Sequence, residues 1–178
     1  MRLHRAAIAL AAAAALVLPP AVMAQGGMAA ADRKFVMEAA RGNLAEVELG
    51  KLAAEKGASE TVKQFGKRMA DDHAKAAAEL KDFADKKGMT LPTDFDPKHK
   101  QLRDRLAKLN GADFDKAYAN EMVKDHKKDV AEFKREANAA KDPDLKAWAG
   151  KTLPTLEDHL KQAQDTQAQV KSAPRAAR

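Results

Sequence analysis

Residues 59–87, with the sequence SETVKQFGKRMADDHAKAAAELKDFADKK, decide the fold of this chain. Alternating steps of four and three residues through this stretch meet apolar or small side chains at nearly every position, with His73 near the middle. Such spacing is typical of a helix that buries one face in a bundle. Ser59 is a favourable N-cap, and Gly88 is a favourable stop. The stretch therefore predicts one long helix of a helical bundle.

The same apolar spacing recurs on both sides of this stretch. It predicts three further long helices at 32–56, 113–140 and 142–171. Asp32 is expected to be the N-cap of the first, and Gly57 to end it. In the last, Pro143 suits the first helical position, whereas Pro154 predicts a kink or a short break near residues 152–153.

The connections between these helices predict the topology. Short turns near residues 57–58 and 141–142 make each flanking pair an antiparallel hairpin. Residues 88–112, with a short predicted helix at 97–109, are much longer than the usual bundle connection of about 2–8 residues. We expect an all-α protein with a ferritin-like four-helix bundle, in which a long crossover joins two hairpins. A plain up-and-down bundle with a decorated loop is the alternative.

Composition supports this prediction and excludes several classes of protein. The 178 residues are 45% hydrophobic and only 4% aromatic, which disfavours an all-β fold. Because the chain has no cysteine, a disulfide scaffold, a cysteine nucleophile, a thiolate zinc site and an iron–sulfur cluster are excluded. The sequence also contains no glycine-rich phosphate loop and no Gly-x-Ser-x-Gly motif.

The first 24 residues have the pattern of a secretory signal peptide. Arg2 and Arg5 precede an apolar run at 6–18, and Ala24 is a small residue at the expected cleavage position. We expect cleavage after Ala24, a periplasmic or otherwise exported product, and no stable membrane insertion afterwards. Loss of the two arginines leaves 30 basic against 26 acidic residues, a net charge of +4. The predicted mature chain has a spacer at 25–31, a bundle domain at 32–171 and a disordered tail at 172–178.

Each of the four predicted helices places one metal-competent residue on its buried face. These residues are Glu46, His73, His126 and His159. Counted from the hairpin turns at 1.5 Å per residue, the first two differ in level by about 6 Å and the last two by about 3 Å. A shell of three nitrogens and one oxygen suits a single zinc, copper or iron ion. We therefore predict one transition-metal site in the core.

Other features of the sequence qualify that prediction. A di-iron bundle site needs Glu-x-x-His pairs, but none of these three histidines has a glutamate three residues before it. Met69 and Met122 stand four residues before two of the histidines, either as helper ligands that would favour copper or as core filling. The histidines could instead form a structural polar layer without metal. An acid precedes each histidine, and because helical neighbours point about 100° apart, it is expected to serve solvent or an adjacent helix.

Four stretches of the chain also carry a resemblance to a known family. They are NLAEVELGKLA at 43–53, the positions Val62, Phe65, Met69 and Asp72-His73, the positions Phe114-Asp115, Tyr118, Met122 and Asp125-His126, and the positions Asp142-Pro143, Trp148, Pro154 and His159. Together they cover about residues 32–164 and resemble the exported bacterial domain-of-unknown-function family 4142. The resemblance implies a ferritin-like four-helix fold and an envelope location, and it implies no particular reaction.

Two functions agree with these observations. The first is an exported ferritin-like bundle that holds a metal ion in its core for metal handling or envelope stress. The second is a non-enzymatic envelope bundle that acts in envelope stress or binds a protein partner or a second copy, with the histidines as a structural polar layer. Basic and acidic residues alternate without interleaved aromatics, so we expect no nucleic-acid partner. The sequence favours a protein that is not an enzyme.

Overall fold

The computed structural model describes residues 27–172, and these residues contain five helices and no strand. The helices are α1 (Ala30–Lys56), α2 (Glu60–Lys86), α3 (Pro97–Ala107), α4 (Gly111–Ala139) and α5 (Pro143–Ser172). The expected all-α class is confirmed. The predicted signal peptide with its cleavage position, and all but the first residue of the predicted tail, lie outside the described residues.

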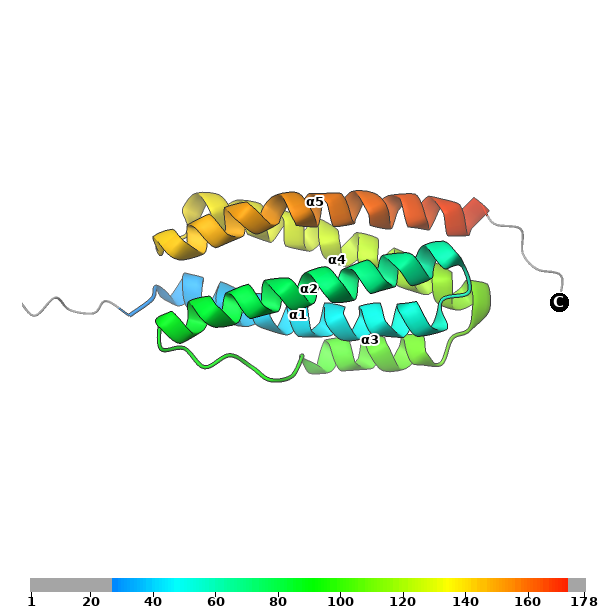
Figure 1. Cartoon of the computed structure of the whole chain (residues 1–178), viewed down its shortest axis with the longest axis horizontal. Coiled ribbons are helices and arrows are strands. Elements are labelled where there is room, and N and C mark those ends of the chain that lie inside the picture. Colours follow the sequence, from blue (N-terminus) through cyan, green and yellow to red (C-terminus); the bar gives the residue numbers. More distant parts are fainter. Residues whose placement is uncertain (1–26, 173–178) are drawn as a thin grey trace, which may run out of the picture.

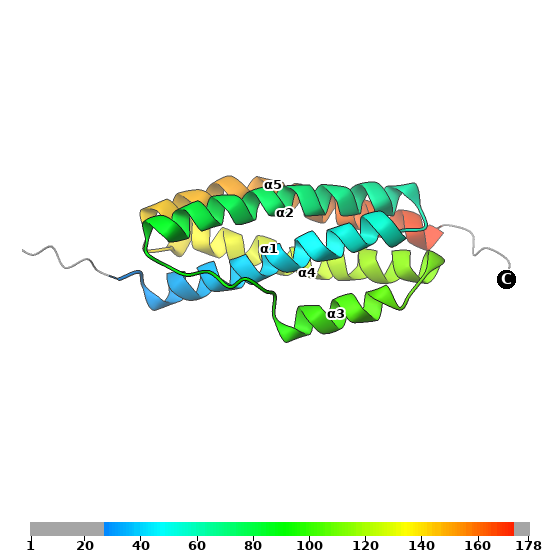
Figure 2. The ribbon, with the colours of Figure 1, turned by 60° about the horizontal axis from the view of Figure 1, so that its bottom comes forward.

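The four long helices form two hairpins that pack against each other. Helix α1 lies beside α2, and α4 lies beside α5 (Figure 1). The crossover from α2 runs along the bundle and leads into α3, which packs on the outside against α1 and α4 (Figure 2). The short predicted helix therefore exists, and it ends two residues earlier than expected.

Local sequence signals explain most helix ends. The Ser59 side chain accepts a hydrogen bond from the Val62 amide, as predicted for an N-cap. Asp96 caps α3 in the same way by accepting from the His99 amide. Helix α2 ends at Lys86, and the chain turns at Gly88, whose φ of +64° favours glycine; the following Met89 amide donates back to the Ala84 carbonyl. These caps fix where the hairpins and the crossover begin.

The prediction that Asp32 caps α1 is wrong. Helix α1 begins at Ala30, and its N-cap position, Ala29, makes no side-chain cap. Asp32 lies within the first turn, buried, and one carboxylate oxygen accepts hydrogen bonds from the Lys141 and Asp142 amides at 2.9 and 2.7 Å. Its carboxylate therefore binds the turn between α4 and α5 and does not cap its own helix.

Asp115 makes the matching contact at the other end of the bundle. It lies near the start of α4, is buried, and accepts hydrogen bonds from the Ala58 and Ser59 amides, both at 2.8 Å. We call Asp32 and Asp115 the turn-binding aspartates. Each hairpin thus supplies a carboxylate that satisfies two backbone amides in the turn of the other hairpin.

Helix α5 runs through Pro154 without the short break that the sequence predicted. Proline cannot donate a hydrogen bond to the carbonyl of Gly150, four residues earlier. Both Gly150 and Pro154 are exposed, so water can bind that carbonyl. One turn away, the Thr152 hydroxyl donates to the Trp148 carbonyl at 2.9 Å. The missing backbone bond therefore lies on the solvent side and does not interrupt the buried face.

Helices α1 and α2 approach each other closely at two glycines. A Cβ atom on Gly50 would lie 2.6 Å from the Gly66 carbonyl oxygen and 2.7 Å from the Ala70 nitrogen. A Cβ atom on Gly66 would lie 2.7 Å from the Gly50 carbonyl oxygen. The backbones of the two helices are in contact here, one turn away from the middle of the bundle.

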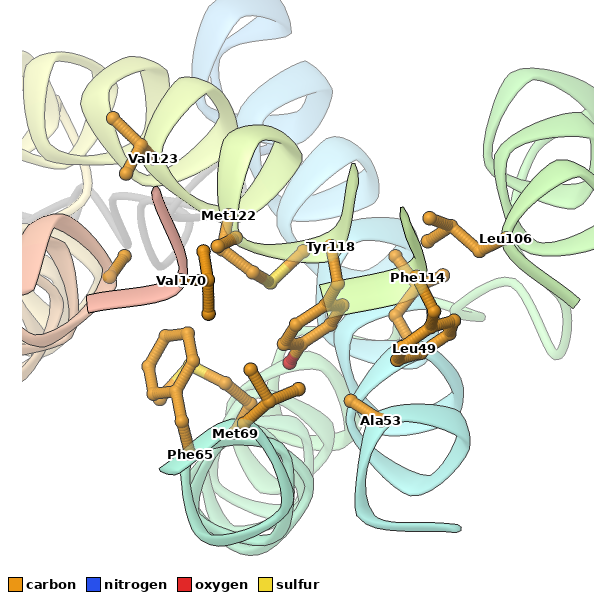
Figure 3. Packing of buried hydrophobic residues seen from close by; sticks show 13 residues of the cluster. Leu49, Ala53, Phe65, Met69, Leu106, Phe114, Tyr118, Met122, Val123 and Val170 are labelled. Atoms are coloured by element: carbon orange, nitrogen blue, oxygen red, sulfur yellow. The ribbon is translucent and has the colours of Figure 1, made fainter. Parts of the chain in front are cut away.

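The core consists of two apolar clusters with a polar layer between them. The first contains Phe65, Met69, Tyr118 and Met122, among others, and Figure 3 shows these side chains converging from α2 and α4. The second contains aromatic residues from α1, α4 and α5 at the opposite end: Phe35, Phe133 and Trp148. The buried polar residues of the middle layer are Asn43, Glu46, His73, His126 and His159. Within residues 27–172, no helix has the length and apolar character needed to cross a membrane.

Candidate metal centre

Three buried histidines from three helices meet in the polar layer. They are His73 on α2, His126 on α4 and His159 on α5, with exposed fractions of 4%, 0% and 1%. Their ring centroids are 5.4 to 5.6 Å apart, and one nitrogen from each ring lies within 4.8 Å of the other two. Two ligands of a tetrahedral zinc ion are roughly 3.4 Å apart, given metal–nitrogen bonds of about 2.0–2.1 Å. Small side-chain shifts would therefore suffice to bring the three nitrogens onto one ion.

Each imidazole has one nitrogen held by a hydrogen bond. The Nδ1 of His73 is 2.9 Å from the Asn43 side-chain oxygen, and the Nδ1 of His126 is 3.0 Å from the Met122 carbonyl oxygen. The Nε2 of His159 is 3.0 Å from a carboxylate oxygen of Asp72. Since all three partners are acceptors, the held nitrogens carry the protons and donate.

The other nitrogen of each ring has no hydrogen-bond partner in the described part of the chain. These atoms are Nε2 of His73, Nε2 of His126 and Nδ1 of His159. Each must be the unprotonated nitrogen of its ring, with a free lone pair, because the proton is on the held nitrogen. Buried acceptors without a donor are rare, since their desolvation costs about 1–3 kcal/mol each. Three of them in one layer are the pattern that a bound cation would satisfy.

The surroundings keep these rings neutral. Burial lowers the pKa of His73 well below its usual value, and the neighbouring His126 and His159 lower it further. Burial lowers the pKa of His126 to about 4. The pKa of His159 is also lowered by burial, although the hydrogen bond to Asp72 opposes this. Neutral imidazole is the metal-binding form, so all three rings are ready to bind at neutral pH.

Outer contacts hold Asp72 in place. Burial opposes its ionisation, but hydrogen bonds from His159 and Lys75 keep its pKa below the usual value. Arg68 also binds Asp72 at 3.3 Å and reaches Asp158 at 2.5 Å. A carboxylate that orients a histidine in this way is the common arrangement around metal-binding imidazoles. The acids at 72 and 158 thus serve neighbouring helices, as their positions predicted.

The other predicted ligands lie elsewhere. Among the described residues, Glu46 is not part of the histidine group, and its carboxyl lies among the acids Asp125 and Asp129. Met69 and Met122 are fully buried in the first apolar cluster, where Figure 3 shows Met122 beside Tyr118. The structure thus places both methionines as core residues, and their role as helper ligands stays a prediction. The role of Glu46 as a fourth ligand also stays a prediction.

A partly open cavity of about 260 Å³ lies beside two of the three histidines. His73 and His159 line its inner end, and the exposed Lys98 on α3 lines its outer part. Six acidic and three basic side chains form its wall together with His99. The excess of carboxylates favours the entry of cations over anions.

Comparisons with known proteins agree with the fold. The profile of the family described as Domain of unknown function (DUF4142) matches residues 17–166. The chain belongs to this family. A crystal structure of a DUF305 fragment from Deinococcus radiodurans is similar to it, with a TM-score of 0.70 over 80% of this chain and 98% of that chain. At 13% identity this similarity shows the fold alone. No curated protein matches the chain.

Two residues of this DUF4142 site were not predicted from the sequence. Asn43 could have been found by counting, since it lies 14 residues before Gly57 while His73 lies 15 after Ala58. The two are thus level to within about 1.5 Å. His99 lines the cavity from α3, and no periodicity on the long helices points to it.

The stability of the metal-free DUF4142 domain should depend on pH through His126. Its pKa is about 4 in the folded chain, below the ordinary 6.5, so the unfolded chain binds more protons between these values. The stabilisation by the neutral ring is complete above pH 6.5 and is lost as the pH falls toward 4. As the pH falls from 6.5 to 4, we therefore expect the free energy of unfolding to decrease by about 3 kcal/mol more in the wild type than in a His126→Leu variant.

Denaturant unfolding of both proteins at several pH values measures this difference. Asp129 and Glu46 have raised pKa values and act in the opposite direction, but they are present in both proteins. Parallel pH profiles of the two proteins would contradict the assignment of this effect to His126.

Proposed function

We propose that this DUF4142 protein is an exported ferritin-like bundle that holds one transition-metal ion at His73, His126 and His159 and serves metal handling in the cell envelope. One observation carries the proposal: each of three buried rings has a donor nitrogen fixed by a protein acceptor, and its other nitrogen has no partner in the described chain. A purely structural polar layer would be expected to pair these nitrogens with one another.

The donor set indicates the class of metal. Three neutral imidazoles suit zinc, copper and iron, whereas calcium and magnesium prefer oxygen ligands. Three protein ligands leave a further coordination position for water or for a ligand that reaches the centre through the cavity. The acidic wall of that cavity supports a role in cation capture more than the turnover of an anionic substrate.

The sequence supports an envelope location. Residues 1–24 have the n-region, apolar run and small residue of a signal peptide, and the chain lacks the thiolates that would oxidise outside the cytoplasm. The modest charge excess of the mature chain, with acids between the basic residues, supports a role without nucleic acid. After cleavage, the mature chain would remain outside the lipid bilayer.

Titration of the chelator-treated protein with Co²⁺ tests the metal centre. Co²⁺ is a spectroscopic substitute for Zn²⁺, and its visible absorption reports nitrogen ligands in a site with few ligands. We expect one Co²⁺ per chain, and alanine substitution of His73, His126 or His159 should weaken binding by more than about 100-fold. Zn²⁺ at about 100 times its Kd should stabilise the wild type by about 2.7 kcal/mol.

His99→Ala is the matched control, because His99 lines the same cavity but does not belong to the histidine group. This variant should bind Co²⁺ within about twofold of the wild type. A wild-type protein that purifies without metal, and whose melting temperature does not respond to zinc, copper or iron, would exclude the proposal. That result would favour the second function, a structural histidine layer in an envelope protein that acts through its surface.

A further inference from the structure

The histidine layer is closed by ion pairs on one side of the bundle and lies beside a cavity on another. On the closed side, Arg68 of α2 pairs with Asp158 of α5 at 2.5 Å, and Glu79 of α2 pairs with Lys151 of α5 at 2.7 Å. These two ion pairs lie on either side of His73 along α2. A hydrated ion could pass between α2 and α5 at the level of the histidines only if these pairs separated.

The other side is the line along which α1 faces α4, which we call the α1–α4 seam. Within residues 27–172, every ion pair of these two helices lies inside one helix or connects α4 to α3, so none joins α1 to α4. The cavity of about 260 Å³ lies along this seam, because α1 and α4 supply more of its lining residues than the other elements together. The seam is therefore the less tightly closed route to the histidines.

Gly42 leaves the α1 wall of this cavity without a side chain. A Cβ atom on Gly42 would meet nothing within 4 Å, so the space in front of it is open. Gly42 lines the same cavity as His73 and His159. Side chains on a helix lean toward its N-terminus, so a larger residue at position 42 would extend over Glu38 and Ala39, which also line the cavity. The size of residue 42 therefore sets the width of this part of the cavity.

We propose that divalent transition-metal ions enter the histidine centre through the α1–α4 seam, past Gly42. This inference rests on the metal centre proposed above and adds the route to it. The cavity wall carries more acidic than basic side chains, so it attracts a cation although the predicted mature chain has a net charge of +4. The free nitrogens of His73 and His159 are buried, so these rings must shift before the ion binds. The seam therefore governs how fast an ion binds and not how tightly.

Stopped-flow measurement of Co²⁺ binding to the chelator-treated protein tests the route. Gly42→Leu should slow association at least about tenfold, and it should slow dissociation by the same factor because the ion leaves by the same route. Its Kd for Co²⁺ should stay within about twofold of the wild type. Gly150→Leu is the matched control, because Gly150 is exposed on α5, does not line the cavity, and its Cβ would meet only the Ala137 Cβ at 3.8 Å. This variant should bind Co²⁺ at a rate within about twofold of the wild type.

The salt dependence of the wild-type rate is a second test, which decides the matter even if Gly42→Leu fails to fold. An ion that enters through the acidic cavity is attracted to it, so association should slow severalfold when the ionic strength rises from about 0.02 to 0.5 M. An ion that approached elsewhere on a chain of positive net charge would be repelled and would bind faster at high ionic strength.

The proposal is overturned if folded Gly42→Leu binds Co²⁺ as fast as the wild type, or if the wild-type rate rises with ionic strength. Either result, with Co²⁺ still bound at equilibrium, excludes the route alone and leaves the histidine centre in place. A wild-type protein that binds no Co²⁺ at equilibrium would exclude the metal centre and the route together.

Discussion

Replacement of Gly50 with alanine should lower the free energy of unfolding by about 3 kcal/mol. The new methyl group would lie 2.6 Å from the Gly66 carbonyl oxygen and 2.7 Å from the Ala70 nitrogen, both backbone atoms of α2. Ordinary contacts of this kind are about 3.5–4.0 Å, so α1 and α2 must separate. Because the clash is with backbone, a change of rotamer cannot relieve it. Denaturant unfolding followed by circular dichroism measures the loss.

Gly42→Ala is the matched control on the same helix. A Cβ atom on Gly42 meets nothing within 4 Å in the described structure, so the variant gains helix propensity without a clash. It should raise the free energy of unfolding by about 1 kcal/mol. Equal effects of the two substitutions would show that α1 and α2 do not touch at Gly50. The contrast in sign therefore tests the close approach itself.

Asp115→Ala should destabilise the protein by about 3 kcal/mol. The substitution leaves the Ala58 and Ser59 amides without the carboxylate oxygens that they contact at 2.8 Å. Hydrogen bonds to a charged acceptor contribute about 1.5–3 kcal/mol each, and partial access of water to the turn offsets some of this. Asp32→Ala should cost a similar amount at the other turn, and the effects should add, since the two sites are at opposite ends of the bundle.

Asp113→Ala separates this effect from simple removal of an acid near the α4 N-terminus. Asp113 lies two residues before Asp115, within the first turn of α4, and it is exposed. Its replacement should cost no more than about 0.5 kcal/mol through the helix dipole. A comparable loss in the Asp113 and Asp115 variants would contradict the role of the turn-binding aspartates.

The sequence was sufficient for features that depend on distance along a helix. Apolar spacing located the long helices, and counting from the turns placed His73, His126 and His159 near one level. The same count put Glu46 about 6 Å from the level of His73, and in the structure Glu46 is not part of the histidine group. Agreement was best where each helix is tied to a short turn, because the turn sets the register of both partners.

Features that depend on rotation about the helix axes, or on a different hairpin, could not be predicted in this way. Asp32 is of a residue type that favours N-caps and lies where the sequence predicted one. In the structure it is instead one of two acids that bind a distant turn. Which imidazole nitrogen carries the proton depends on Asn43 and Asp72, whose side chains meet the rings across helices. Counting from the turn gives the axial level of Asn43, but it contains no information about the direction of a side chain around the helix axis.

The turn-binding aspartates have a consequence for the order of folding. The amides of Ala58 and Ser59 donate hydrogen bonds to a carboxylate that lies 57 and 56 residues later in the chain. Asp32 accepts hydrogen bonds from amides that lie 109 and 110 residues later. Contacts of such long range form slowly compared with a hairpin of adjacent helices. During synthesis the first hairpin can therefore assemble early, but its turn is completed only when α4 has emerged. The second closure, at Lys141 and Asp142, joins the first turn of α1 to the turn between α4 and α5, so it can form only after the whole of α4 has been synthesised.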